Sequence, residues 1–348
     1  MSYTKKGLPW IQGAKDVSDC TTAREVMAKS GLNFFVKKCE LVARMPFSLQ
    51  RNYDKLEDDE FSYEGNIYKD CPNAFATYRT DTNTPLGVVK SRYEVVQNTD
   101  AFNFFDNAIG KDKAIFQTAG SFGNGHRIFV SVKLPNTVEL VNKDVIDSYL
   151  IFTNTHDGSS GITILFSPIR VVCENTLNAA IKHAQSFITF RHTQSVHNRI
   201  DEAQELLGIS AKMSENSALL YNNLISKEIN DLEAVNVIAK TFLTDAEINK
   251  VNEYNSHAGF NAIANRNALA LEATGISSKK ANIIHNAAMY YFTGIGQKEI
   301  VGTNWGVYNA ITGYFSNVAN LEGNKRMDSL LYGNGSNISS KALNMLVA

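Results

Sequence analysis

The chain has 348 residues, with 34 Lys and Arg against 35 Asp and Glu, which gives a formal net charge of −1. Hydrophobic residues make up 44% of it, which excludes a disordered chain, since disorder needs low hydrophobicity and high net charge. No apolar run approaches the roughly 18 residues of a membrane helix, and no apolar stretch follows Lys5 and Lys6 as in a secretory signal. We therefore expect a cytoplasmic protein that does not enter membranes. A dedicated duplex-DNA binder usually has a basic excess, so any nucleic-acid contact must come from a local basic patch.

The cysteines predict neither a zinc ribbon nor a redox motif. Cys20, Cys39, Cys71 and Cys173 lie far apart, and no Cys-x-x-Cys pair occurs. Free thiols in a reducing compartment are the simplest interpretation.

The length and the change of pattern along the chain predict three regions, 1–74, 75–208 and 209–348. In the first, Asp19 or Thr21 can cap a short helix that ends at Gly31, and residues 34–42 are typical of a strand. Residues 54–60 carry five acids against one lysine, which favours a solvated loop or a short exposed helix over a metal site.

The second region is rich in strands. Residues 75–80 and 86–89 predict a hairpin, and a helix is expected over 100–109, where Gly110 ends the apolar spacing. Further strands are expected at 115–119, 127–134, 149–154 and 162–166. We expect one antiparallel sheet with a packed helix, an α+β fold.

From Cys173 onward the pattern becomes helical. A helix is expected to begin at Asn175, followed by an extended piece at 186–191 and a long helix over 195–207. Additional helices are expected near 213–228, 231–240, 244–254, 280–292, 304–316 and 339–347. The last region is therefore predicted to be mostly helical.

A local basic excess lies in the middle of the chain. Residues 158–200 hold four Lys or Arg and one acid, Glu174. Arg170 and Arg191 could offer planar guanidinium groups to phosphate oxygens. Asn175 and Thr176 are expected where a strand leads into a helix, a position suited to an anion. The alternative is a helix with a solvated polar face beside a sheet edge.

Aromatic and basic residues alternate at several places. Tyr78 precedes Arg79, Lys90 and Arg92 precede Tyr93, and Phe187 and Phe190 precede Arg191 and His192. Such a pattern suits single-stranded nucleic acid, because bases stack on rings while cations hold the backbone. The alternative is that most of these rings belong to the core.

Other chemistries find less support. The glycine-rich turn Gly120-x-x-Gly123-x-Gly125 is followed by a strand, whereas a phosphate-binding loop needs a helix there. No Gly-x-Ser-x-Gly elbow occurs, and no His-x-x-x-His spacing recurs. The run from His156 to Ser159 is typical of a turn. We expect no catalytic residue, no metal and no cofactor.

Several phrases in this order resemble the phage/plasmid-like protein family (domain of unknown function 932). They are Tyr93–Asn98, Ala119–Gly120, Gly125–Phe129, Thr153–Ser159, Pro168–Leu177, Arg191–Thr193 and Asn304–Ala310. The resemblance spans roughly residues 8–316. It implies a protein of phages, prophages or plasmids, with no settled activity to transfer. Its setting among mobile elements implies DNA replication, recombination or host takeover, and the sheet with its helix is loosely similar to phage strand-annealing proteins.

The leading hypothesis is a cytoplasmic protein that binds single-stranded nucleic acid, as a strand-annealing, recombination or replication accessory. The residues expected to hold phosphates are Arg170, Lys182, Arg191, His192 and Arg199, with Arg79, Lys90 and Arg92 extending the track. Phe187 or Tyr93 is expected to stack a base. Asn154, Asp157, Asn175 and Thr176 are interpreted as residues that fix the turn and the strand–helix junction.

Two other hypotheses stay open. One is a metal-dependent nuclease or hydrolase that would use His126, His156, Asp157 and His192. The other is a non-enzymatic oligomeric scaffold or host-interaction protein, whose helical last third would supply the packing surface. A homo-oligomer is also expected for the leading hypothesis.

Overall fold

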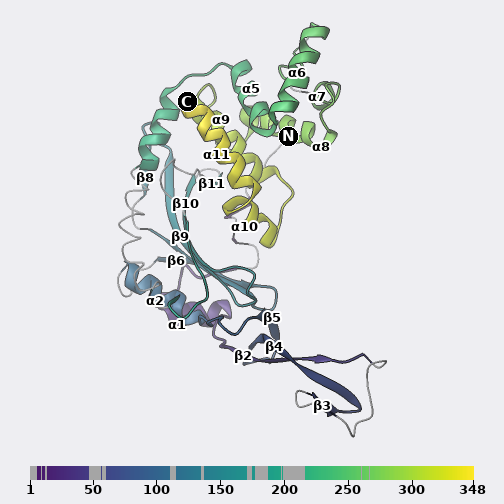
Figure 1. The fold of residues 1–348 in the computed structure, drawn as a ribbon. Coiled ribbons are helices and arrows are strands. Elements are labelled where there is room, and N and C mark those ends of the chain that lie inside the picture. Colours follow the sequence, from purple (N-terminus) through teal and green to yellow (C-terminus); the bar gives the residue numbers. More distant parts are fainter. Residues whose placement is uncertain are drawn as a thin grey trace.

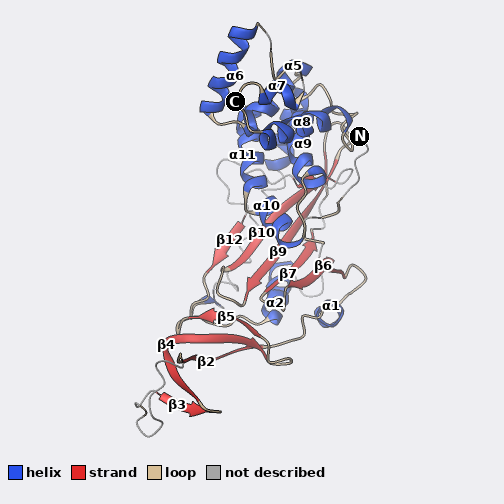
Figure 2. Ribbon diagram, turned by 90° about the vertical axis from the view of Figure 1, so that its right-hand side faces the viewer, coloured by secondary structure: helices blue, strands red, loops and turns tan. Residues whose placement is uncertain are grey.

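The computed structural model has three parts: a central antiparallel sheet, a bundle of helices beyond one end of it, and a smaller sheet that projects from the other end (Figure 1, Figure 2). This is the α+β class that the sequence predicts. The structure describes residues 6–8, 10–11, 14–46, 56, 60–109, 115–134, 137–170, 175–176, 187–196, 198, 216–259, 261–265 and 267–348. Residues 54–60, predicted as an acidic loop, lie mostly outside this part.

The first elements are strand β1 (Ala14–Asp16) and helix α1 (Ala23–Ser30). Thr22 caps α1 by accepting a hydrogen bond from Glu25 N, and the Glu25 carboxylate accepts one from Thr22 N, so the two form a capping box. Gly31 ends the helix with φ of 73°. The predicted helix is confirmed, but its cap is Thr22 rather than Asp19 or Thr21.

The smaller sheet consists of β2 (Val36–Arg44), β3 (Glu60–Tyr63), β4 (Asn66–Arg79) and β5 (Pro85–Val89). Its order is β2-β4-β3, and β5 also pairs with β4. The predicted strand at 34–42 and the predicted hairpin are confirmed. β4, however, begins at Asn66, so it runs through the expected boundary between residues 74 and 75. Residues on both faces of β2 and β3 are exposed, because this sheet extends away from the body (Figure 1).

The central sheet has the order β1-β6-β7-β9-β10-β11, with β12 also paired to β10 and β8 to β9. All of these pairings are antiparallel. Residues 175–176 form a short strand rather than the predicted start of a helix, because they pair with 169–170 of β10. The strands are β6 (Ile115–Phe122), β7 (Arg127–Lys133), β8 (Val138–Glu139), β9 (Val145–Thr155), β10 (Ile162–Arg170), β11 (Asn175–Thr176) and β12 (Phe187–Phe190).

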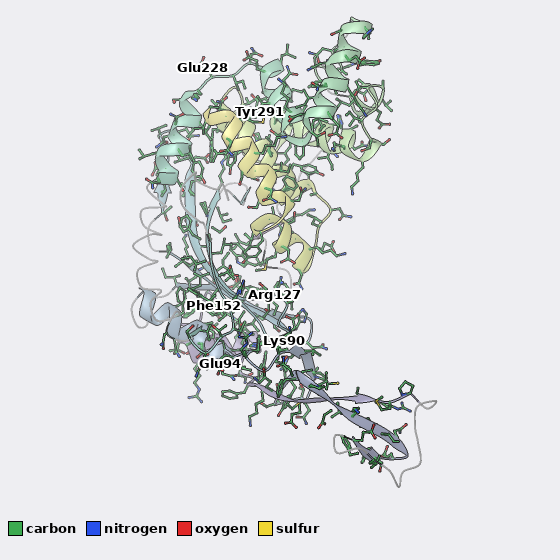
Figure 3. All side chains as sticks on the ribbon, in the orientation of Figure 1. Lys90, Glu94, Arg127, Phe152, Glu228 and Tyr291 are labelled. Carbon is green, nitrogen blue, oxygen red and sulfur yellow. The ribbon has the colours of Figure 1, made fainter. Side chains whose placement is uncertain are left out.

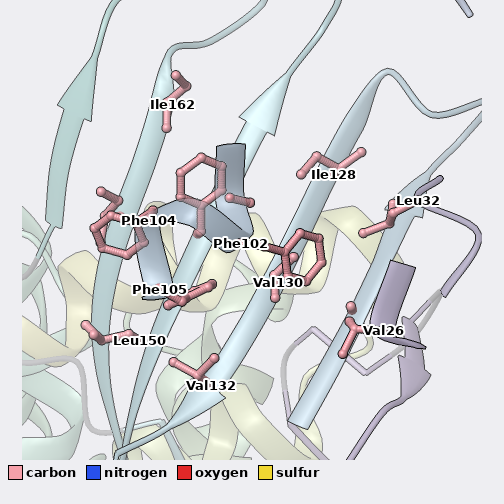
Figure 4. Close-up of a cluster of buried hydrophobic side chains, with 14 of the residues drawn as sticks. Val26, Leu32, Phe102, Phe104, Phe105, Ile128, Val130, Val132, Leu150 and Ile162 are labelled. Atoms are coloured by element: carbon pink, nitrogen blue, oxygen red, sulfur yellow. The ribbon is translucent and has the colours of Figure 1, made fainter. Parts of the chain in front are cut away.

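Both faces of this sheet are covered, which explains why β9 and β10 are apolar on both sides. On one face α1 and α2 (Asn98–Ile109) bury a cluster that includes Phe104, Phe105 and Leu150 (Figure 4). The rings of Phe104 and Phe152 lie 5.8 Å apart. On the other face Tyr149 and Ile151 pack with residues of a later helix, α10 (Gly323–Leu331).

The C-terminal region is helical, as predicted. Leu140 and Ile146 of the sheet region belong to the same buried cluster as residues of α9 and α11, so the bundle packs directly on the end of the sheet. Helices α7 and α10 were not predicted. The predicted helix over 195–207 lies almost entirely outside the described residues. The helices are α5 (Asp231–Phe242), α6 (Asp245–Ala258), α7 (Ala268–Glu272), α8 (Ser278–Thr293), α9 (Asn304–Gly313) with a π-helical turn (Tyr314–Val318), α10 (Gly323–Leu331) and α11 (Asn334–Val347). Within the described ranges, no helix has both the length and the apolar character needed to cross a bilayer.

Candidate nucleic-acid interface

A groove of about 1040 Å³ opens between three segments of the chain. Residues 88–94 form one wall, residues 191–194 form another, and the turn at 158–161 closes one end. We call this cavity the basic groove. Lys90 and Glu94 mark it in Figure 3, where the smaller sheet meets the central one. The groove unites two of the predicted ring–cation phrases, which are almost 100 residues apart in sequence.

Hydrogen bonds fix the first wall on the smaller sheet. The Lys38 ammonium group of β2 donates to the carbonyl oxygens of Ser91 and Tyr93, at 2.8 and 3.0 Å. Asn73 accepts from Ser91 N at 3.0 Å. The chain leaves β5 and is therefore held in a compact loop that carries Lys90 and Arg92 at its surface.

A reciprocal contact joins the two walls. Glu94 N donates to the His192 carbonyl at 3.1 Å, and His192 Nδ1 donates to the Glu94 carbonyl at 2.9 Å. The second bond requires the hydrogen on Nδ1, because a carbonyl oxygen only accepts. The spacing of the walls is thus set by one backbone–backbone bond and by the buried His192 ring.

Three exposed cations line the groove: Lys90, Arg92 and Arg191. Within the described part of the chain, their side chains make no ion pair and no hydrogen bond. Glu94 is the one acid among the described lining residues. Unpaired cations around a concavity create a positive potential that attracts anions.

The rings of Tyr93 and His192 stack at a centroid distance of 4.4 Å with 18° between their planes. The Tyr93 hydroxyl donates to the Thr155 carbonyl at 2.8 Å. Burial, and to a lesser extent the charge of Asp157, raise the pKa of Tyr93, so its phenol stays protonated. Burial lowers the pKa of His192. His192 therefore contributes an uncharged ring at neutral pH, rather than the cation that the hypothesis gives it.

Two glycines allow the turn to approach β5 and β12 closely. A Cβ at Gly87 would lie 2.4 Å from the Asp157 Cα, and a Cβ at Gly161 would lie 2.3 Å from the Phe190 carbonyl oxygen. Neither distance is sterically possible for a real side chain. The turn therefore packs against β5 and β12 backbone to backbone.

The family phrases around the turn form a buried polar cluster behind the groove. His156 is fully buried, and its Nε2 lies 2.9 Å from Asn98 Oδ1. Burial, reinforced by the nearby His192, lowers the pKa of His156 to about 3. Asn154 Nδ2 donates to the Val96 carbonyl, and Asp157 Oδ1 accepts from Ser159 N. These contacts hold the turn and the start of α2 together.

Two arginines expected in the phosphate track lie elsewhere. Arg79 pairs with Asp81 at 2.7 Å and lies over the Phe34 ring, 3.9 Å from its centroid. Arg170 is 2% exposed, and its Nε donates to Asp144 Oδ2 at 2.6 Å. Its Nη2 also donates to the Gly296 carbonyl. Neither guanidinium group lines the basic groove. Arg79 is paired with Asp81, and Arg170 is paired with Asp144.

The remaining predicted residues cannot be placed by their side chains. Lys182 and Arg199 lie outside the described residues. For Phe187, Asn175 and Thr176 the structure describes the backbone strand alone. Asn175 and Thr176 form β11, and the residues that follow them lie outside the described part of the chain, so the strand–helix junction stays a prediction.

The described residues offer no set of metal ligands for the hypothesis of a metal-dependent hydrolase. Among the residues that the structure describes, no three or more His, Cys, Asp or Glu side chains come together in a way that could hold a metal ion. His156 uses Nε2 for Asn98, and Asp157 closes its own turn.

The sequence did not single out Lys38 and Glu94 for this groove. Lys38 acts through carbonyl oxygens of a loop that follows β5, and Glu94 acts through its backbone. No local pattern signals either role, since both depend on which strands become neighbours.

The fold and the groove define an α+β protein with an open, positively lined cleft. The sequence model described as "Domain of unknown function (DUF932)" matches residues 85–334, most of the chain, and the chain belongs to this family. The match begins at β5, later than the resemblance at residue 8 suggested, and includes every residue that lines the basic groove. Neither a curated protein nor a solved structure matches the chain.

Proposed function

We propose that this protein binds single-stranded nucleic acid in the basic groove. The observation that carries the proposal is the convergence of Lys90, Arg92 and Arg191, three exposed cations from two separate segments, with no carboxylate paired to any of them within the described residues. Cations that serve only solubility can be spread over the surface and do not need to lie together in one concavity. Phosphates along a strand match such a row of positive charges.

The aromatic lining of the groove favours a strand over a duplex. Its volume of about 1040 Å³ lies near the upper limit of small-molecule sites, which run to roughly 1,000 Å³. The neutral Tyr93–His192 ring pair adds an aromatic wall next to the cations. Rings beside cations are the combination that single-strand binders use, because exposed bases can lie against rings only when they are unpaired.

The wider role follows from the family resemblance. We place the protein among mobile-element proteins of phages or plasmids that act in the host cytoplasm, as an accessory to strand annealing, recombination or replication. This role includes self-association, since annealing needs two strands held near each other.

The test measures binding of fluorescent oligo(dT) by anisotropy over a range of salt concentrations. With three phosphate contacts, the logarithm of the affinity is expected to fall with that of the salt concentration by a slope of about −2, since each contact on a single strand contributes about −0.7. The triple variant Lys90→Ala, Arg92→Ala, Arg191→Ala is expected to lose this slope and most of the affinity.

A matched control removes three exposed cations elsewhere: Arg24→Ala, Lys279→Ala and Lys298→Ala. This control changes the net charge by the same amount and is expected to retain binding. Equal losses in both triple variants, or no binding of the unaltered protein at low salt, would contradict the proposal. Annealing is measured by adding a complementary strand to the same assay. Self-association is measured by mass photometry of the mixture.

A further inference from the structure

A second cavity, of about 360 Å³, adjoins the basic groove on the other side of the 158–161 turn. Ser160 lines both cavities. The second cavity lies between the ends of β7, β9 and β10 and the helix α10 that crosses them. We call it the hydroxyl pocket, because Thr153, Thr155 and Thr163 line it together with Ser160.

The hydroxyl pocket results from a change of residue type along one face of the sheet. Successive residues of a strand alternate between faces, so Tyr149, Ile151, Thr153 and Thr155 share the face that α10 covers. The first two pack in an apolar cluster with Met327. Thr153 and Thr155 continue the row as hydroxyls, although they are only 6% and 2% exposed. Their hydroxyls are hydrogen-bonded within the protein, Thr153 Oγ1 to the Thr163 carbonyl at 3.4 Å and Thr155 Oγ1 to the Ser160 carbonyl at 2.5 Å, so this wall of the pocket is polar.

An ion pair borders this pocket. Arg127 Nη1 of β7 donates to Asp328 Oδ1 of α10 at 2.6 Å (Arg127 is labelled in Figure 3). Within the described residues, Asp328 Oδ2 has no hydrogen-bond partner, and Oδ1 keeps a second lone pair. The Asp328 side chain is 48% exposed. The pair thus presents a guanidinium donor beside two carboxylate acceptors.

This order of donor and acceptors selects among nucleobases. The Watson–Crick edge of guanine has the O6 acceptor followed by the N1–H and N2–H donors, which is the complementary order. Adenine and cytosine offer one exocyclic donor beside an acceptor, and thymine one N–H between two carbonyl groups. A carboxylate that accepts from two adjacent N–H groups forms a bidentate contact, which is stronger and more specific than a single bond.

We propose that the hydroxyl pocket binds a guanine base, with Asp328 accepting from N1–H and N2–H and Arg127 donating to O6. This inference rests on the proposed function for the path of the strand: a nucleotide with its phosphate in the basic groove reaches the hydroxyl pocket past Ser160. The protein would therefore hold single strands by their phosphates and set their register at guanine.

The test compares oligo(dT) with the same strand carrying one central guanine, adenine, cytosine or hypoxanthine. Guanine is expected to raise the affinity about tenfold, the usual scale of a good bidentate base contact. Hypoxanthine, which lacks the N2 amino group, is expected to lose most of this gain. Asp328→Asn is expected to abolish the preference and leave oligo(dT) affinity unchanged, whereas Asp245→Asn, at an exposed site on α6, is expected to change neither.

A second measurement separates this inference from the proposed function. Calorimetric titration with guanosine and adenosine monophosphates reads the pocket without a strand. Binding of the guanosine form that Asp328→Asn abolishes supports the pocket even if oligo(dT) fails to bind. No preference for guanine in either assay, or a preference that survives Asp328→Asn, overturns the inference and leaves the basic groove to its own test.

Discussion

The chain uses its cations in two ways, and the contrast between the basic groove and the junction of sheet and helices shows how. At the junction, Arg170 is buried with Asp144, which also accepts a hydrogen bond from Trp305 Nε1 at 2.9 Å. In the groove, Lys90, Arg92 and Arg191 are exposed and have no such partner among the described residues. Arg170 connects the central sheet to the helical region, so its role is to stabilise the fold. Pairing and burial, rather than position in a motif, separate structural cations from those available to a ligand.

The largest effect is expected from breaking the buried pair. Asp144→Ala leaves Arg170 charged and without its carboxylate in a buried site, and removes the acceptor of Trp305. The free energy of unfolding is expected to fall by about 3–5 kcal/mol, as for other buried pairs that lose one partner. Denaturant unfolding followed by circular dichroism measures this loss.

Two controls sharpen that experiment. Asp19→Ala breaks the exposed pair with Lys29 and is expected to leave stability unchanged. The double variant Arg170→Met, Asp144→Leu removes both charges and is expected to recover much of the stability, because no buried charge is left alone. A loss as large for Asp19→Ala as for Asp144→Ala would refute the contrast.

A smaller effect is expected from pH, through the neutral histidine behind the groove. The pKa of His156 is lowered from 6.5 to about 3 in the folded protein. Between these two values the unfolded chain binds more protons than the folded one, so stability falls as the pH falls. His156 alone is expected to account for a loss of about 2 kcal/mol between pH 7 and pH 5. His192, with its lowered pKa, acts in the same direction.

The variant His156→Gln should flatten this pH dependence, measured as unfolding free energy against pH. His257→Gln, at an exposed site on α6, serves as the control and should leave the slope as it is. If both variants show the slope of the unaltered protein, His156 is not held neutral by burial.

The smallest effect is expected from Tyr93→Phe. The change deletes the hydroxyl that bonds the Thr155 carbonyl but keeps the ring on His192. Stability is expected to fall by about 1 kcal/mol, the usual net value of one hydrogen bond. Affinity for oligo(dT) is expected to stay the same, since the cations hold the phosphates. A loss of affinity comparable to that of the triple cation variant would move the binding site from the cations to the phenol.

Much of the fold could be predicted from local patterns. Helix α1, the β4–β5 hairpin and the apolar runs of β9 and β10 are local features, and the sequence signals them directly, although the cap of α1 is Thr22 and not the predicted Asp19 or Thr21. Helices α7 and α10 escaped prediction: α7 is only five residues long, and α10 begins at a glycine without a side-chain cap. The local pattern at 175–176 predicts the start of a helix, whereas these residues form a strand because they pair with β10.

The candidate site could be predicted only in part. Lys90, Arg92, Tyr93, Arg191 and His192 were chosen for local ring–cation spacing, and all five line the groove. The local excess around Arg170 gave no hint of Asp144, because that pairing depends on the register of β9 and β10. Asp328 lies far away in sequence from Arg127, and only the packing of α10 across the sheet brings them together.

The close approaches at Gly87 and Gly161 carry a consequence for the dimensions of the cleft. Each contact is made where a methyl group would collide with main-chain atoms of the opposing segment. An alanine at either place would force the two main chains apart, although it would change no charge. The close packing of the turn beside the cleft therefore depends on two residues without side chains, whereas the charge of the cleft depends on other residues.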